Sequence, residues 1–252
     1  MKIAVLMTCH NRKESTLRCL RGLPSDLDVF LVDDASTDGT GDAVREFSRA
    51  ERDGRVEVLE GNGSLYWARG MALAWRASLK ADGRVGYDGW LWLNDDVALS
   101  PEAISTRLCA SYAAHPDDIQ VGACVNSKGE ETYGLRDDLF TGNFVFVPRA
   151  VYTKLGMICG EYAHAWADSD YAMRAKRAGI KVVSCGVVGR CEGHANRPSL
   201  KGLSLRQRWA MLHDPKGWNL HDLFLYRRRN WGVCAAVASC IHMIFHVLKG
   251  VR

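Results

Sequence analysis

The chain of 252 residues lacks the sequence features of several protein classes. Its nine cysteines form no Cys-x-x-Cys pair and are odd in number, which argues against a zinc ribbon and a disulfide framework and for a reducing compartment. The apolar start, residues 1–7, is too short for a signal peptide and is followed at once by the polar residues 9–12. We therefore expect a cytoplasmic protein.

Glycine-rich phosphate loops are also missing. No G-x-G-x-x-G follows the first predicted strand, residues 2–7, and no G-x-x-x-x-G-K-[ST] occurs in the chain. The sequence therefore argues against a dinucleotide-binding Rossmann motif and excludes a P-loop NTPase. If the protein binds a pyrophosphate, a metal ion must supply most of the neutralising charge.

Acidic residues are scarce near the C-terminus. Residues 197–252 contain ten Lys and Arg against two acids, a net charge of +8, whereas residues 1–196 carry −4. A basic segment of this kind favours nucleic acid or an anionic membrane surface as a partner. The composition is otherwise ordinary for a globular protein, with 47% hydrophobic and 25% charged residues, and the length suffices for one large domain.

Strand and helix patterns alternate along the first half of the chain. Apolar runs predict buried strands at residues 2–7, 28–32, 56–59 and 90–93, and helical spacing of apolar residues predicts helices at 14–23, 40–51 and 65–79. This alternation predicts an α/β fold with a mainly parallel sheet.

The second half predicts a mixture of elements. In order these are a helix at 101–114, a strand at 120–125, a polar excursion at 128–138, a strand at 140–148, helices at 149–156 and 168–178, and a strand at 180–183. Asp170 and Arg174 are four residues apart, so we expect them to pair on the surface of their helix.

Polar or acidic clusters follow three of the first four predicted strands, at residues 8–12, 33–34 and 94–96. In parallel sheets ligands bind at the carboxyl ends of strands. The adjacent carboxylates Asp95 and Asp96 would repel each other, and Mn2+ or Mg2+ would compensate them while bridging to substrate phosphates. The alternative, a helix N-cap, is better served by Ser100 with Pro101. Together with the basic, glycine-rich loop 61–70, the clusters predict a site for a nucleotide and its metal ion.

Two further candidate site residues could also have ordinary structural roles. Asp168 precedes a predicted helix, where a carboxylate is ordinarily an N-cap. His194 lies near a turn, and such a histidine is more often a plain polar residue than a ligand.

Several ordered motifs resemble a family 2 glycosyltransferase of the GT-A fold. Residues 5–12 resemble the opening strand and turn of that family, and residues 32–40 are close to its VDDxSTDGT signature. Residues 93–96 stand where the family has its DXD-type metal motif, and residues 168–179 resemble its EDxDLxxRxxxxG motif, which supplies the base. The resemblance covers about residues 1–196.

The resemblance implies a role for each candidate residue. The nucleoside of the donor would be held by Thr8, Asn11, Arg12, Asp33 and Asp34. Arg69 would approach the diphosphate or the base, and Asp95 the ribose or the donor sugar. Asp96 and His194 would bind Mn2+ or Mg2+, and Asp168 would be the general base of an inverting transfer. The donor would be a UDP- or dTDP-linked sugar, and the acceptor a hydroxyl of a glycan or a lipid-linked acceptor.

Three residues depart from the family pattern. Asn94 begins the metal motif in place of an acid, Ala167 replaces the acid before the base, and Gly70 stands where the family often has Asn. These departures bear on the donor sugar more than on the reaction class. Residues 66–67 resemble the donor loops of some bacterial polysaccharide transferases, including rhamnosyl-type ones.

We expect residues 1–196 to form the GT-A catalytic domain, with a nucleotide-sugar half at 1–97 and an acceptor half at 98–196, and residues 197–252 to form a basic, amphipathic helical tail. Residues 231–248 contain no Asp, Glu, Lys or Arg, and their length is at the lower limit for a membrane-spanning helix. An interfacial helix is the better interpretation, with an ordinary core helix as the alternative. The acceptor chemistry would then place residues 203–252 on the inner face of the plasma membrane, and nucleic acid is not an expected partner.

Two other functions compete with this interpretation. A sugar nucleotidyltransferase would need a glycine-rich loop with Lys or Arg after the first strand, which residues 8–12 do not provide. A non-catalytic nucleotide- or glycan-binding module would bind its ligand without dependence on a metal ion.

Overall fold

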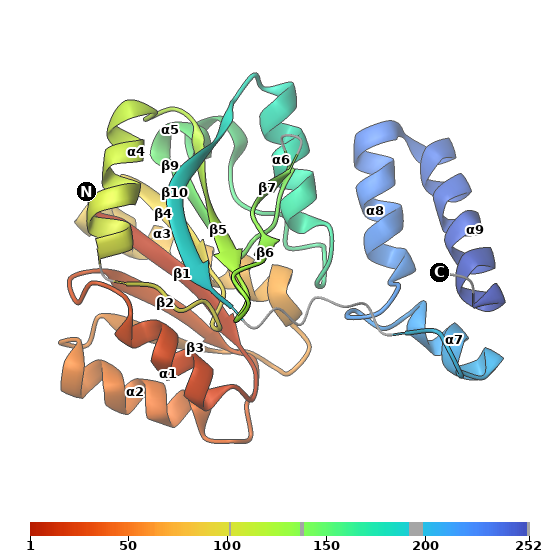
Figure 1. Ribbon diagram of the computed structural model, residues 1–252, viewed down its shortest axis with the longest axis horizontal. Coiled ribbons are helices and arrows are strands. Elements are labelled where there is room, and N and C mark those ends of the chain that lie inside the picture. Colours follow the sequence, from red (N-terminus) through yellow and green to blue (C-terminus); the bar gives the residue numbers. More distant parts are fainter. Residues whose placement is uncertain (101, 137–138, 192–198, 251–252) are drawn as a thin grey trace.

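The computed structural model describes residues 1–100, 102–136, 139–191 and 199–250. Helices flank a central sheet (Figure 1), so the predicted α/β class is confirmed. The strand order is β10-β5-β9-β4-β1-β2-β3, with β6 paired to β5. The strands of this sheet are β1 (Ile3–Cys9), β2 (Asp28–Asp33), β3 (Val56–Glu60), β4 (Gly89–Leu93), β5 (Ile119–Val125), β6 (Glu131–Tyr133), β9 (Phe144–Pro148) and β10 (Val182–Arg190).

The strands β3, β2, β1 and β4 run parallel, as the sequence predicts. Parallel neighbours need crossover connections, which are α1 (Lys13–Arg21), α2 (Thr40–Glu51) and α3 (Tyr66–Val85). Because these strands point the same way, the segments after β1, β2 and β4 leave the sheet at the same edge.

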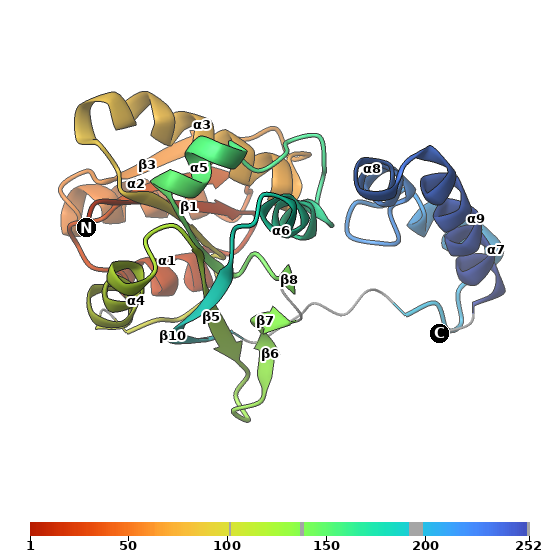
Figure 2. The ribbon, with the colours of Figure 1, turned by 90° about the horizontal axis from the view of Figure 1, so that it is seen from above.

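The two faces of the sheet carry separate hydrophobic cores. Ala4 and Leu6 of β1 pack in one core with α3, whereas Ile3, Val5 and Met7 pack in the other, which is the alternation that a strand imposes. Figure 2 shows α3 and α5 (Arg149–Leu155) on one side of the sheet and α1 and α4 (Cys109–Ala114) on the other. A π-helical turn, η1 (Ala103–Leu108), leads directly into α4.

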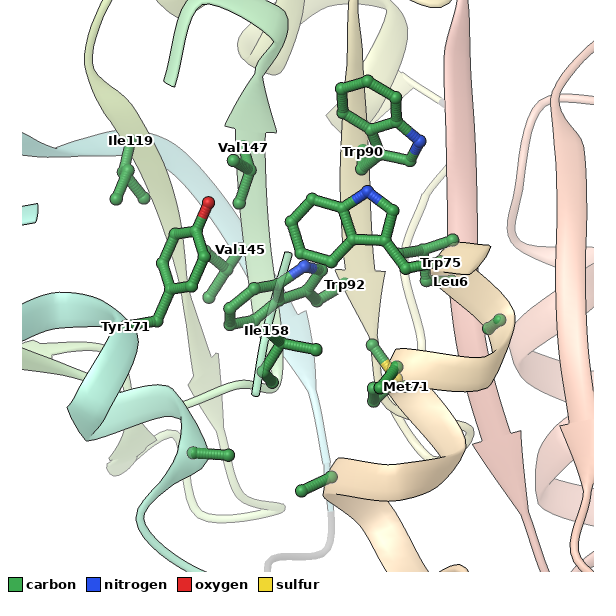
Figure 3. Close-up of a cluster of buried hydrophobic side chains, with 14 of the residues drawn as sticks. Leu6, Met71, Trp75, Trp90, Trp92, Ile119, Val145, Val147, Ile158 and Tyr171 are labelled. Carbon is green, nitrogen blue, oxygen red and sulfur yellow. The ribbon is translucent and has the colours of Figure 1, made fainter. Parts of the chain in front are cut away.

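Large aromatic side chains dominate the core beneath α3 (Figure 3). Trp75 of α3 lies 5.8 Å from both Trp90 and Trp92 of β4, measured between ring centroids, and Trp92 lies 5.1 Å from Tyr171. An aromatic side chain of this size buries 150–250 Å², which corresponds to about 4–6 kcal/mol each as an upper bound. The prediction that residues 90–93 form a strand buried on both faces is confirmed.

The second half of the sheet is mixed, because β9 runs antiparallel to both β4 and β5. The polar excursion predicted at 128–138 is partly wrong, since it contains β6 and also β7 (Leu135–Arg136). The predicted strand 140–148 is divided into β8 (Leu139–Phe140), which pairs with β7, and β9. Gly142 lies in the intervening turn, where a Cβ would collide with the indole of Trp67. β6 has three residues and β7 has two, which is too short for an alternating pattern to show in the sequence.

The Asp170–Arg174 pair is inside the protein, so its predicted surface position is wrong. Asp170, on α6 (Ala167–Arg177), has a side chain only 1% exposed, and its oxygens lie 3.4 Å from Nε of Arg174 and 3.4 Å from Nε of Arg229. Two guanidinium groups offset the cost of burying one carboxylate. Since Arg229 belongs to the C-terminal segment, the pair also joins that segment to α6.

The basic C-terminal segment folds into α7 (Leu205–Met211), α8 (Leu220–Trp231) and α9 (Val233–Lys249), which lie together beside α6 (Figures 1 and 2). Leu225 and Tyr226 of α8 belong to the core beneath α3, and the Tyr226 ring stacks on Trp166 with centroids 4.8 Å apart. Gly232, with φ of 87°, separates α8 from α9. Among the described residues, none of the helices combines the length and the hydrophobicity that a membrane span requires.

Candidate active site

The polar segments after β1, β2 and β4 meet at one edge of the sheet, as predicted. They line a cavity of about 410 Å³, here called the strand-end cavity, whose walls include Thr8, Arg12, Asp34, Asn94 and Asp95. The arrangement follows from the common direction of the strands, which places the loops after their carboxyl ends side by side.

A second cavity of about 580 Å³, here called the Asp168 cavity, contains both Asp96 and Asp168 in its walls. The two cavities share several lining residues and therefore adjoin. The shared residues are Arg12, Trp67, Asn94, His164 and Lys216. A ligand in the strand-end cavity can thus place one end next to Asp168.

Asp34 is held by the loop that precedes α3. Its carboxylate accepts hydrogen bonds from the backbone N–H groups of Gly63 at 2.8 Å, Leu65 at 3.0 Å and Tyr66 at 2.9 Å. A carboxylate has about four lone-pair sites, so about one is left for a ligand. Asp34 therefore shapes the start of α3 and still faces the strand-end cavity.

Asn11 and Asp33 organise the turn after β2. Oδ1 of Asn11 accepts a hydrogen bond from the N–H of Thr37 at 2.7 Å, and Oδ1 of Asp33 accepts one from the N–H of Ser36 at 3.0 Å. Neither side chain is among the described residues that line the two cavities. Their predicted contact with a donor nucleoside stays a prediction.

Arg69 points back toward its own loop. Its Nη1 donates to the carbonyl oxygen of Ser64 at 3.3 Å, and it is absent from the described walls of both cavities. The structure therefore gives Arg69 a loop-stabilising contact, and its predicted approach to the diphosphate stays a prediction.

Arg12 compensates the two carboxylates that follow β4. Its Nη2 lies 2.8 Å from Oδ2 of Asp96, and its Nε lies 3.4 Å from Oδ2 of Asp95. Asp95 is 4% exposed, and burial raises its pKa to about 7 against the opposing effect of Arg12. The repulsion expected between the two acids is thus relieved by a cation from the loop after β1.

Asp96 has a free coordination position for a cation. Its Oδ1 is buried and has no hydrogen-bond partner, although the residue lines the Asp168 cavity. Hard divalent cations often take one or two carboxylates and complete their coordination with substrate phosphates, so the residue fits the predicted metal-ligand role. No group of three His, Cys, Asp or Glu side chains suited to a metal ion is found among the described residues, and the other predicted ligand, His194, lies outside them.

Asn94 is hydrogen-bonded to Trp67 of α3. Nε1 of the Trp67 indole donates a hydrogen bond of 2.8 Å to Oδ1 of Asn94. The neutral amide therefore joins α3 to the end of β4. A carboxylate could accept the same bond, so the contact does not explain the amide at this position.

Asp168 lies in the first turn of α6 but does not cap that helix. The N-cap position belongs to Trp166, while Asp168 Oδ1 accepts from the N–H of Ser169 at 2.7 Å and Oδ2 accepts from the N–H of Gly142 at 3.1 Å. Loss of hydration raises the pKa of Asp168, and these two N–H groups oppose the shift. A carboxylate with a raised pKa, facing a cavity, is suited to accept a proton.

Sequence patterns alone missed three residues in these walls. Oγ1 of Thr141 and Nδ1 of His164 are buried without a hydrogen-bond partner and line the Asp168 cavity. Lys216, from the segment between α7 and α8, lines both cavities, and its positive charge contributes to lowering the pKa of His164, after the larger effect of burial. The basic character of the segment gave a general signal for Lys216, but no local pattern pointed to the site.

A family of known sequences matches this chain. The family described as Glycosyl transferase family 2 matches residues 4–177. No curated protein sequence matches the chain.

Solved structures share the fold at low sequence identity. Mannosyltransferase PcManGT from Pyrobaculum calidifontis, in complex with GDP-Man and Mn2+, superposes with a TM-score of 0.59 at 18% identity, covering 94% of this chain and 73% of that one. TarS from S. aureus in complex with UDP gives 0.59 at 15% identity, covering 99% and 90%. GalNAc-T7 with UDP, GalNAc and Mn2+ gives 0.56 at 13% identity, covering 100% of this chain and 56% of that one.

Proposed function

The chain belongs to glycosyl transferase family 2 and is a glycosyltransferase, and we propose that it is an inverting, divalent-cation-dependent enzyme with Asp168 as its general base. The observation that carries the proposal is the position of Asp168, whose pKa is raised, in a cavity that adjoins the strand-end cavity and also contains Asp96. We favour a glycosyltransferase over a sugar nucleotidyltransferase or a non-catalytic binding module. The match to the family includes the motifs at residues 32–40, 93–96 and 168–177.

The acceptor hydroxyl loses its proton to Asp168 as its oxygen forms a bond to the anomeric carbon of the donor. The bond from that carbon to the diphosphate breaks, and its electron pair leaves with the nucleoside diphosphate. A single displacement of this kind inverts the anomeric configuration. The N–H groups of Ser169 and Gly142 hold both carboxylate oxygens, so the base is oriented before the acceptor arrives.

Negative charge develops on the departing diphosphate. Asp96, with its unpartnered Oδ1, would hold Mn2+ or Mg2+, which supplies Lewis-acid stabilisation of the phosphate oxygens. Arg12 and Lys216 line both cavities, and their cationic groups would bind the same diphosphate. These side chains take the place of the glycine-rich phosphate loop that the sequence lacks.

The chemical class of the donor follows from the strand-end cavity and from the similar structures. The cavity offers Thr8 and the remaining lone pair of Asp34 to a nucleoside. PcManGT was solved with GDP-Man and Mn2+, and TarS with UDP, which supports a nucleoside-diphosphate sugar and a divalent cation. We propose a UDP- or dTDP-linked donor and a role in building a bacterial-type surface glycan.

Replacement of the base tests the function directly. Asp168→Asn should retain the fold and the binding of the nucleoside diphosphate but lower kcat by at least about a hundredfold, since general base catalysis contributes about 10²–10⁴. A screen of nucleotide sugars by hydrolysis and thermal shift with Mn2+ should first identify the donor. Turnover of the variant at the wild-type rate would place the base elsewhere.

A further inference from the structure

A third cavity, of about 350 Å³, lies between α8 and α9 and is here called the α8–α9 cavity. Its walls include Trp166, Leu223, Arg227, His242 and Met243. Trp166 also lines the Asp168 cavity. The side chain of Trp166 is therefore a wall of both cavities, which lie on either side of this one residue.

Arg227 is the cationic side chain of this cavity. Its guanidinium carbon lies 4.9 Å from the ring centroid of Trp231, and its Nε is buried without a hydrogen-bond partner. No ion pair joins it to an acid within the part of the chain that the structure describes. A guanidinium with an unused Nε–H donor suits a phosphate group, while Leu223 and Met243 on the same walls suit a hydrocarbon chain.

The outward face of α9 is apolar and uncovered. Val233, Val237, Ile241 and Phe245 are 57%, 45%, 49% and 60% exposed, and their spacing of four residues puts them on one face of the helix. Soluble proteins rarely expose a contiguous apolar patch of this kind without a partner. We call these four residues the outer α9 face.

The charge around this face suits an anionic lipid surface. Residues 223–250 contain no Asp or Glu, whereas Arg227, Arg228 and Lys249 are cationic. The nearby Arg229 is paired with Asp170 and Glu161. An apolar helix face bordered by basic residues, with a Trp at its start, is the pattern of a helix that lies in a membrane interface.

The cavity and the outer α9 face involve the same turns of α9. Ala238 and His242 line the α8–α9 cavity and directly follow Val237 and Ile241 in the helix. Successive helical residues point about 100° apart, so the cavity wall and the outer α9 face lie on neighbouring sides of the same helix.

We propose that the α8–α9 cavity binds the phosphate-bearing lipid part of a membrane-embedded acceptor, with Arg227 on the phosphate and the outer α9 face in the bilayer interface. This assignment rests on the proposed transferase function, because it names the chemical class of that enzyme's acceptor. The acceptor hydroxyl then lies beside Asp168, and the lipid phosphate lies beyond Trp166.

Vesicle flotation of the full chain tests the proposal, with farnesyl phosphate in phosphatidylcholine as the probe. Arg227→Gln should weaken binding to these vesicles about tenfold, because a charge-assisted hydrogen bond to phosphate is lost. The matched control, Arg228→Gln, changes the exposed neighbouring residue on the same helix and should alter binding less than about twofold. Equal losses in the two variants would mean a general attraction of charge and would overturn the cavity assignment.

Two further arms separate the possible sources of the phosphate. Vesicles with phosphatidylglycerol in place of farnesyl phosphate should bind more weakly and should not distinguish the two arginine variants. Inorganic phosphate should not compete with farnesyl phosphate for the protein at equal concentration. Strong competition by inorganic phosphate would overturn the lipid assignment.

The outer α9 face is tested with the double variant Ile241→Asn and Phe245→Asn. The double variant should no longer float with the vesicles. Sedimentation should give the same mass for the wild type and the double variant. A wild-type dimer that the double variant dissociates would identify a second copy of the chain as the occupant and would overturn the membrane contact. Nucleoside-diphosphate binding, measured on the same samples, separates the outcomes: a chain that binds UDP or dTDP but not farnesyl phosphate keeps the proposed function and loses this inference.

Discussion

Asp222 of α8 binds the backbone of Ala163 with both of its carboxylate oxygens, each 3.1 Å from the Ala163 N–H. The same carboxylate accepts from the N–H groups of His164 at 3.0 Å and Ala165 at 3.2 Å, and it is fully buried. Three successive N–H groups form an anion-binding concavity. The C-terminal segment thereby fixes the loop that leads directly to Asp168.

The Asp222 contact predicts that Asp222→Asn lowers the free energy of unfolding by about 2–3 kcal/mol, because an amide leaves buried N–H groups unpaired. It should also lower kcat, since the loop before Asp168 loosens. Chemical denaturation and donor turnover measure the two effects. The control Asp117→Asn, at an exposed residue, should stay within about 0.5 kcal/mol of wild type; a loss of similar size in both variants would contradict the role of the buried contact.

The pH dependence of transfer should report Asp168. Its pKa is raised by loss of hydration, and only the ionised form accepts a proton, so kcat should rise with pH through a value above that of an ordinary Asp. The free energy of unfolding should change in the opposite direction and fall as pH rises. The unfolded chain loses this proton at a lower pH than the folded chain, so ionisation of Asp168 favours unfolding. The difference in Tm between Asp168→Asn and wild type should therefore shift in favour of the variant from about pH 4 to about pH 7. A difference that is constant with pH would contradict the raised pKa.

Removal of the divalent cation should abolish transfer, and Mn2+ or Mg2+ should restore it. Asp96→Asn removes the carboxylate whose Oδ1 is unpartnered. It should weaken Mn2+ binding in the presence of nucleoside diphosphate at least about tenfold, because loss of a residue that only supports a metal ligand already costs about that much. Electron paramagnetic resonance of free Mn2+ measures the affinity. Retention of wild-type affinity in this variant would place the cation elsewhere.

Lys216 should bind the diphosphate of the donor. Lys216→Met keeps most of the side-chain length but removes the charge, and it should lower kcat/KM for the donor about tenfold or more. Lys201→Met is the matched control, because Lys201 is also exposed and lies in the same C-terminal segment but outside the described walls of both cavities. Steady-state kinetics measures kcat/KM for both variants. An equal decrease in the two variants would mean that the effect comes from the net charge of the segment and not from the position of Lys216.

The strand ends could be predicted because their signal is local. The change from the apolar residues 90–93 to the acidic residues 95–96 marks both a buried strand and the edge at which it ends. The alternation of strands and helices then requires a parallel order, which brings the segments after β1, β2 and β4 together. Spacing was less informative for Asp170 and Arg174, because an i, i+4 pair has the same sequence pattern whether it faces solvent or core.

The sequence by itself determined the α/β class, the edge of the sheet that carries the site, and the motif that contains Asp168, since each depends on residues close together in the chain. Only the tertiary structure decided that Asp222 and Lys216, from the basic C-terminal segment, reach this site. It also decided that Asn94 accepts a hydrogen bond from Trp67. The hydrogen bonds of Asn94 and Asp222 join residues 27 to 59 positions apart in the chain. Such long-range packing is set by how whole helices dock on the sheet, and no local periodicity encodes it.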